Sequence, residues 1–201
     1  MQSINQLLQS DMPLKWLFTG DSITQGSYYT FLSRDYVQIF EERLHRELNR
    51  IRDIVIKTGV SGWTTENILN DIQWNILQFH PDVVSIMLGM NDASILKIEK
   101  FVDNYRIILE TVLSQTEASV ILHTPNPVTE GYDLTRSENL PEIVEQVKCL
   151  GKQYGLPVVN HWEAFNKYSA KEMSRAQVQL FDRVLANHSI AENSVQVSES
   201  S

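Results

Sequence analysis

The chain has 201 residues, of which 42% are hydrophobic and 21% are charged, a balance that fits one globular domain and excludes a disordered chain. Its formal charge of −8 argues against nucleic acid as a partner, because phosphate backbones are bound by clustered Lys and Arg. No apolar stretch approaches the length of a membrane span, and the single cysteine, Cys149, excludes an internal disulfide.

The first part of the chain alternates strand-like and helix-like segments. Residues 14–18 form a compact apolar run that ends at a Thr-Gly pair, which is typical of a strand. Residues 34–50 carry apolar side chains at helical spacing with charges between them and predict an amphipathic helix. The run 53–57 predicts the second strand. A helix is then expected over residues 64–79, since a threonine can cap its start and Pro81 prevents its continuation.

The second part continues the alternation. The run 83–88 is almost wholly apolar, and a strand without polar alternation is usually covered on both faces, as in a parallel sheet. The remaining elements are expected in this order: a helix over 98–114, a strand over 119–122, a loop over 124–136, a helix over 140–154, a strand over 156–159 and a helix over about 162–185. Residues 191–201 are polar and are expected to fray.

Five strands that alternate with helices predict an α/β protein. We expect a three-layer α/β/α sandwich around a five-stranded parallel sheet with right-handed crossovers. No repeat, low-complexity tract or linker divides the sequence, so a single domain over residues 1–201 is expected.

Three short polar motifs each follow directly after one of the first three predicted strands. They are Gly20-Asp21-Ser22-Ile23-Thr24, Gly59-Val60-Ser61-Gly62 and Gly89-Met90-Asn91-Asp92. Ligands of open α/β sheets bind outside the carboxyl ends of the strands, so the three motifs are expected to converge. Such a convergence brings together a nucleophilic hydroxyl and hydrogen-bond donors, the combination that acyl transfer needs.

Each motif also has a simpler interpretation. Ser22 can be part of an ordinary turn, Gly62 can be a turn glycine before a helix, and Asn91 can cap a helix. In the functional interpretation Ser22 is the nucleophile, while the Ser22 N–H, the Gly62 N–H and the Asn91 side-chain amide donate to an oxyanion. The common order and strand context of the motifs favour function.

In these three motifs the sequence resembles the SGNH/GDSL hydrolase superfamily. The motifs match the first three sequence blocks of that superfamily. The resemblance extends from Leu14 to about Trp162 and includes Thr124-Pro125-Asn126-Pro127 after the fourth strand. It implies a flavodoxin-like SGNH fold, Ser22 as nucleophile and an oxyanion hole made by Ser22, Gly62 and Asn91. It also implies ester or thioester hydrolysis without a cofactor or metal.

The fourth block of that family, Asp-x-x-His near the C-terminus, is not intact in this chain. An alignment on Asp182 puts Leu185 at the position of the base, and an alignment on His188 puts Leu185 at the position of the acid. By chain order, His188 is the best candidate for the base that activates Ser22, with Asp182 as the residue that orients it.

The other histidines have simpler interpretations. His45 is expected on the surface, His80 at the end of a helix, and His161 as a cap or surface residue. His123 lies at the carboxyl end of the fourth predicted strand, on the edge that carries the motifs, and is expected to pack there.

The sequence therefore predicts a cytoplasmic GDSL-type serine esterase that acts on a small acyl ester, such as an acetylated sugar. The first ten residues show neither the basic nor the apolar region of a secretory signal, and one cysteine fits the cytoplasm. The alternative is an SGNH-like domain that has lost its base and only binds a ligand. A nucleotide- or flavin-binding sandwich fits less well, because residues 20–26 lack the Gly-Lys-Ser/Thr of a P-loop. The sequence leaves the oligomeric state open.

Overall fold

In the part of the chain that the structure describes, the sheet consists of five parallel strands: β1 (Lys15–Gly20), β2 (Ile54–Lys57), β3 (Val83–Met87), β4 (Ser119–His123) and β5 (Val158–Val159). Their order in the sheet is β2-β1-β3-β4-β5, which is the flavodoxin-like order. The computed structural model describes residues 3–26, 33–128 and 133–167.

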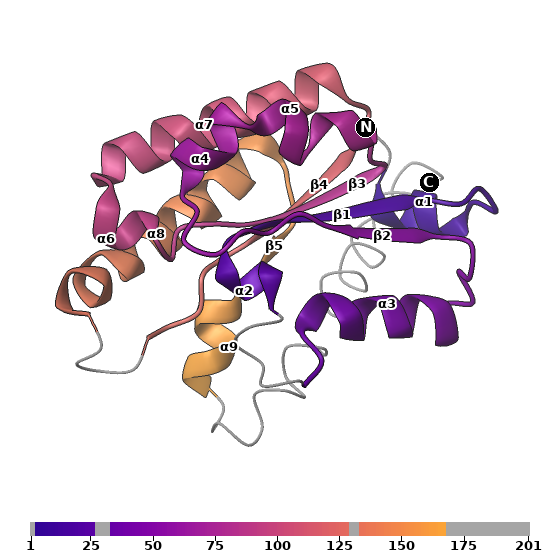
Figure 1. Ribbon diagram of the computed structural model, residues 1–201, viewed down its shortest axis with the longest axis horizontal. Helices are drawn as coiled ribbons and strands as arrows, with labels where there is room; N and C mark the ends of the chain where they lie inside the picture. The colour runs from indigo at the N-terminus through magenta and orange to yellow at the C-terminus, as the bar shows by residue number, and fades with distance from the viewer. Residues whose placement is uncertain (1–2, 27–32, 129–132, 168–201) are drawn as a thin grey trace, which may run out of the picture.

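Ten helical segments connect and flank the strands within those residues. They are α1 (Ile4–Gln9), α2 (Ser22–Gln25), α3 (Tyr36–Arg46), α4 (Thr65–Asn70), α5 (Ile72–Asn75), the 3-10 helix η1 (Leu77–Phe79), α6 (Asp92–Ile95), α7 (Ile98–Gln115), α8 (Leu134–Tyr154) and α9 (His161–Lys167). In Figure 1 the strands run from α1 on the right towards α2, α6 and α9 on the left.

The helices lie on both faces of the sheet, so the predicted three-layer sandwich is confirmed (Figure 1). One apolar core joins side chains of α4, α7 and α8 to residues such as Leu17 and Val84 of the strands. A second core on the opposite face joins α1 and α3 to residues such as Trp16 and Phe18. Neighbouring strand residues serve opposite cores because side chains alternate across a strand. Each fully buried apolar side chain contributes roughly 1.5–3 kcal/mol to this sandwich.

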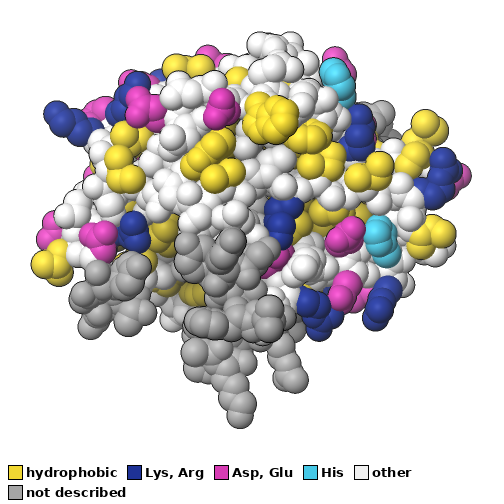
Figure 2. Space-filling view, viewed as in Figure 1, with side chains coloured by type: hydrophobic (Ala, Val, Ile, Leu, Met, Phe, Trp, Pro, Cys, Tyr) yellow, Lys and Arg dark blue, Asp and Glu magenta, His cyan; other side chains and the backbone are white. Residues whose placement is uncertain are grey.

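The surface mixes side chains of every kind. On the face seen in Figure 2, basic and acidic side chains are interspersed, with apolar side chains between them. No helix within the described ranges is both long enough and apolar enough to cross a bilayer.

The predicted helix over 64–79 is interrupted, which corrects the sequence analysis. It forms α4, α5 and η1, with non-helical backbone at Asp71 and Ile76. Asn75 is buried and directs its amide to the Thr58 carbonyl oxygen (3.0 Å) and its oxygen to the Thr19 hydroxyl. These contacts tie the end of α5 to β1 and to the loop after β2.

Two further boundaries differ from the prediction. Helix α8 begins at Leu134 instead of residue 140, because the carboxylate of Asp133 caps it by accepting from the Arg136 N–H (2.9 Å). Pro141 lies inside this helix. Strand β5 has two residues, Val158 and Val159, where four were expected.

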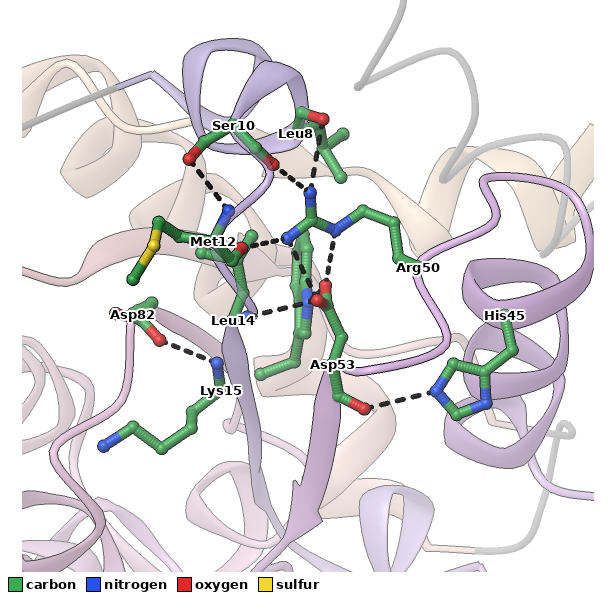
Figure 3. Close-up of polar contacts among 10 residues, drawn as sticks. Leu8, Ser10, Met12, Leu14, Lys15, His45, Arg50, Asp53 and Asp82 are labelled. Carbon is green, nitrogen blue, oxygen red and sulfur yellow. Dashed lines mark hydrogen bonds and ion pairs between the residues drawn. The ribbon is translucent and has the colours of Figure 1, made fainter.

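A buried ion pair, drawn in Figure 3, lies at the amino-terminal ends of the strands, which we call the amino edge of the sheet. The opposite ends are called the carboxyl edge. Arg50 and Asp53 form two hydrogen bonds, from Nε to Oδ2 (2.8 Å) and from Nη2 to Oδ1 (2.9 Å). The remaining guanidinium N–H groups of Arg50 donate to the carbonyl oxygens of Leu8, Ser10 and Met12. This pair therefore ties the segment after α1 to the start of β2.

Candidate functional site

The first motif forms the turn from β1 into α2. Asp21 is the N-cap of α2 and accepts a hydrogen bond from the Ile23 N–H (2.9 Å). Ser22 is the first helical residue and is half-buried. Its backbone N–H belongs to the first turn, where N–H groups have no partner within the helix. Ser22 thus brings a hydroxyl and an N–H of the first helical turn to the same place.

The second motif forms a β-turn over residues 60–63. The Trp63 N–H donates to the Val60 carbonyl oxygen (3.2 Å), which closes the turn. Gly62 has a φ of +80°, whereas Ser61 is not among the residues with positive φ. A positive φ at the third position alone defines a type II turn, which explains why a glycine stands there.

The third motif follows β3, at the point where the chain enters α6. Asn91 precedes the helix and donates from its side-chain amide to the Trp63 carbonyl oxygen (2.9 Å). An amide has two N–H groups, and the second makes no hydrogen bond within the described part of the chain. Asn91 therefore touches the second motif and keeps one donor available.

The segments that carry the three motifs adjoin one another, as the sequence predicts. The Ser61 N–H donates to Oε1 of Gln25 in α2 (2.8 Å), and the Val60 N–H donates to the Gly20 carbonyl oxygen (3.0 Å). A Cβ on Gly59 would lie 2.8 Å from the backbone nitrogen of Gln25, so only a glycine lets the two segments approach this closely. Gly20 is also paired with Met87 in the register of β1 and β3.

Asp92 joins the third motif to the helix after the second. Its Oδ1 accepts from both the backbone N–H (2.9 Å) and the hydroxyl (2.6 Å) of Thr65. Asn104 of α7 donates to the same hydroxyl (3.2 Å). All three side chains are buried. This contact was not predicted from the sequence, from which only a threonine cap at the start of the helix was expected.

Two carboxyl groups next to the site are incompletely hydrogen-bonded. Oδ2 of Asp21 and Oδ2 of Asp92 are buried and have no partner among the described residues. Burial, together with the charge of Asp92, raises the pKa of Asp21 to about 7, although the hydrogen bond from the Ile23 N–H lowers it. Burial also raises the pKa of Asp92, against the hydrogen bonds from Thr65.

His123 does not face the site as a free base. It is fully buried; its Nε2 lies 2.7 Å from the Ser85 hydroxyl and its Nδ1 lies 2.8 Å from Nε2 of His161. The expectation that it packs at the strand end is confirmed. The expectation that His161 is a cap or surface residue is wrong, because His161 is only 2% exposed.

The two imidazoles are held neutral. Burial lowers the pKa of His123 well below its ordinary value, and the neighbouring His161 lowers it further. Burial lowers the pKa of His161 to about 4. His161 was misjudged because nothing in the local sequence signals a side chain that is completed by a residue 38 positions away.

The predicted base and its orienting residue, His188 and Asp182, lie outside the described residues. The roles assigned to Ser22, Gly62 and Asn91 stay predictions, while the proximity of their segments is observed.

Comparisons with known proteins agree with this fold. A model of the GDSL-like lipase/acylhydrolase family matches residues 18–177. The acetylxylan esterase Axe2 of Geobacillus stearothermophilus superposes with a TM-score of 0.70 and 21% identity, over 85% of this chain and 93% of that chain. A lipase/acylhydrolase of Enterococcus faecalis has a TM-score of 0.66 and 27% identity, over 80% of this chain and 82% of that chain.

Further similar proteins include mutants of Axe2 and one relative found by sequence. Three solved Axe2 chains are catalytic mutants with alanine in place of a serine, an aspartate or a histidine, the last two separated by two residues in that chain. An uncharacterized protein of Mycoplasma pneumoniae is 29% identical over 127 residues, which make up 60% of this chain. The matched part spans 14% of that relative's length.

Proposed function

This chain belongs to the GDSL-like lipase/acylhydrolase family, and on that premise we propose that it is a serine esterase that hydrolyses a small acyl ester. The observation that carries the proposal is the contact of three segments at one edge of the sheet. The turn over residues 60–63 receives Gln25 of α2 on one side and the Asn91 amide on the other. A nucleophilic hydroxyl and oxyanion donors are thereby available from adjoining segments.

In the proposed reaction Ser22 Oγ attacks the ester carbonyl carbon and a base takes the hydroxyl proton. The carbonyl oxygen becomes an oxyanion that accepts hydrogen bonds from the N–H groups of Ser22 and Gly62 and from the side-chain amide of Asn91. The tetrahedral intermediate expels the alcohol, which takes up the proton from the base, and leaves an acyl-enzyme. Water then attacks the acyl-enzyme and regenerates Ser22.

We propose His188 as the base and Asp182 as the residue that orients it. Chain order supports His188, because the base of this family follows the other three blocks. His123 is a poor alternative, since both of its ring nitrogens have protein partners and burial lowers its pKa. A serine hydroxyl needs such a base because it is a weak nucleophile while protonated.

A second candidate is a domain that binds an ester-like ligand without hydrolysing it. The altered fourth block favours this alternative, because neither register of residues 182–188 restores both an acid and a base. We also propose a cytoplasmic location, which the single cysteine supports.

Hydrolysis of p-nitrophenyl acetate by the wild type and by Ser22→Ala tests the proposal. We expect loss of turnover in Ser22→Ala and unchanged turnover in the control Ser114→Ala, which alters an exposed serine at the end of α7. Wild-type turnover equal to that of Ser22→Ala would leave the binding domain as the better reading.

The base is tested with a matched pair of histidine substitutions. His188→Asn is expected to reduce turnover to the level of Ser22→Ala, because both groups act in the same step. The control is His80→Asn; His80 is exposed with a φ of +47°, which asparagine tolerates. Full activity of His188→Asn would remove this residue from the mechanism but would leave the role of Ser22 standing.

The size of the acyl group is tested with p-nitrophenyl acetate, butyrate and octanoate. A small acyl pocket predicts that kcat/KM falls as the chain lengthens. Acetylated xylo-oligosaccharides are the first sugar esters to try, because the structurally similar Axe2 is an acetylxylan esterase.

A further inference from the structure

The Gly62 N–H, the proposed oxyanion donor, belongs to the turn over residues 60–63, and its position depends on how that turn is held. Among the described residues, no atom lies within 4 Å of the position that a Cβ on Gly62 would occupy, so their side chains do not fix this residue by packing. Glycine also adopts both signs of φ readily, and a turn with glycine at the third position can be of type I or type II. The conformation therefore needs external support.

The turn type decides which group the turn presents. Types I and II differ by a flip of the central peptide, which here joins Ser61 to Gly62. That peptide carries the Gly62 N–H on one side and the Ser61 carbonyl oxygen on the other. A flip would replace a donor by an acceptor at the same place, and an acceptor repels an oxyanion.

The position of the turn relative to Ser22 is set by a different contact. Gln25 is the last residue of α2, the helix that begins with Ser22, and its Oε1 accepts the Ser61 N–H at 2.8 Å. This bond ties the residue before Gly62 to the helix that carries the nucleophile. On the opposite side, the Trp63 carbonyl oxygen is held by Asn91.

We propose that Gln25 is a positioning residue of the oxyanion hole. Its side-chain oxygen anchors the turn over residues 60–63, so that the Gly62 N–H stays at a constant distance from Ser22 Oγ. The inference rests on the proposed function, because it gives that N–H its role. Gln25 touches neither the substrate nor the proton in transfer, and it acts through the position of Gly62.

Gln25→Met tests the anchor, because methionine has a similar length and no oxygen to accept the Ser61 N–H. An oxyanion contact forms only in the transition state, so we expect kcat to fall about tenfold with KM unchanged. The loss is smaller than the 10²–10³-fold typical of deleting an oxyanion donor, since the donor itself remains. The control is Gln153→Met on the exposed side of α8, which is expected to keep the wild-type kcat.

A double-mutant cycle with Gly62→Ala separates positioning from general damage. Alanine has room at this position but disfavours the φ of +80°, so Gly62→Ala is expected to flip the peptide and lower kcat about 100-fold. Adding Gln25→Met to Gly62→Ala should cost little more, because the anchored donor is already lost. Losses that multiply in the double variant would overturn the proposal.

Two measurements distinguish failure of the anchor from failure of the esterase proposal. If Ser22→Ala abolishes turnover while Gln25→Met equals Gln153→Met, the esterase proposal stands and the anchor is wrong. Amide hydrogen exchange at Ser61 gives a readout that needs no substrate: it should be faster in Gln25→Met than in the wild type. Unchanged exchange at Ser61 would overturn the anchor whatever the activity.

Discussion

The two edges of the sheet both hold buried carboxylates, and the hydrogen bonding of these groups differs. At the amino edge, the two oxygens of Asp53 accept four hydrogen bonds, from Arg50 (two), the Leu14 N–H and the Trp16 indole N–H (Figure 3). At the carboxyl edge, Asp21 and Asp92 each have one buried oxygen without a partner among the described residues.

The carboxyl groups at the two edges are therefore expected to affect different properties of the protein, stability at one and function at the other. A buried carboxylate stabilises the fold only while all its hydrogen-bond and ion-pair partners are present. Removal of one partner leaves a buried charge without compensation. A buried carboxyl group with an unpaired oxygen costs stability and is retained where a site needs it. The pair at the amino ends of the strands is therefore expected to act on stability, whereas the unpaired oxygens at the carboxyl ends lie beside the proposed active site.

The largest expected effect on stability is at the amino edge. Asp53→Ala should lower the free energy of unfolding by about 3–5 kcal/mol, because Arg50 would keep a buried charge without its carboxylate. Urea unfolding measures the loss, and kcat of the folded fraction should equal the wild-type value. The control is Asp103→Ala, whose pair with Arg106 is exposed and should contribute no more than about 1 kcal/mol. Equal losses in the two variants would contradict the comparison.

The largest expected effect on activity is at the carboxyl edge. Asn91→Ala should lower kcat by about 10²–10³-fold, because it removes a donor to the oxyanion and releases the Trp63 carbonyl oxygen. The free energy of unfolding should change by only about 1 kcal/mol, the value of one hydrogen bond. Asn70→Ala, an exposed asparagine at the end of α4, serves as the control. A kcat equal to that of the wild type would remove Asn91 from the oxyanion hole.

The unpaired oxygen of Asp21 predicts a pH dependence of stability. Its pKa is raised by burial from 3.8 to about 7, so the folded protein binds a proton that the unfolded chain has lost. The contribution of Asp21 to the free energy of unfolding should therefore be largest below pH 3.8. It should fall as the pH rises towards 7, by up to about 1.4 kcal/mol per pH unit.

Asp21→Asn tests this dependence. Asparagine keeps the cap on the Ile23 N–H and carries no charge, so the variant should be more stable than the wild type at pH 8, by about 1–3 kcal/mol. Urea unfolding at pH 5 and pH 8 measures the difference. A variant that is less stable than the wild type at pH 8 would show that the charged form of Asp21 has partners.

The smallest expected effect concerns the histidine pair, and its sign is opposite. The pKa of His161 is lowered from 6.5 to about 4. Its contribution to the free energy of unfolding is therefore fully present above pH 6.5 and is lost as the pH drops towards 4. Between pH 6.5 and pH 5 the loss from this group should reach about 1–2 kcal/mol. His161→Gln should weaken this acid sensitivity, and His80→Gln, an exposed histidine, should leave it unchanged. The same acid sensitivity in all three proteins would assign it to other groups.

The strands and the edge that carries the site could be predicted from the sequence. Apolar runs such as 83–88 stop at a glycine, and in a parallel sheet the motifs that follow such runs meet at the carboxyl ends of the strands. Ser22, Gly62 and Asn91 could be selected because each lies at such an end. The start of α8 was predicted at residue 140 instead of Leu134, because the cap at Asp133 was not recognised.

The contacts between distant residues could not be predicted. The pairing of His123 with His161 and of Gln25 with Ser61 depends on which loops the sheet order brings together, and local periodicity carries no such information. The contacts of Asn75, the last residue of α5, were equally out of reach, since its partners Thr19 and Thr58 come from other segments.

The sequence by itself determined the alternation of strands and helices, the edge at which polar motifs gather, and the residue types available there. Those properties follow from hydrophobic spacing and turn chemistry, which act over a few neighbouring residues. Only the tertiary structure decided which carboxylates are fully paired, which histidines are buried and neutral, and which side chain anchors the turn at Gly62. Those properties depend on burial and on partners from distant segments, because both the desolvation of a charge and the completion of its hydrogen bonds arise only when the layers pack.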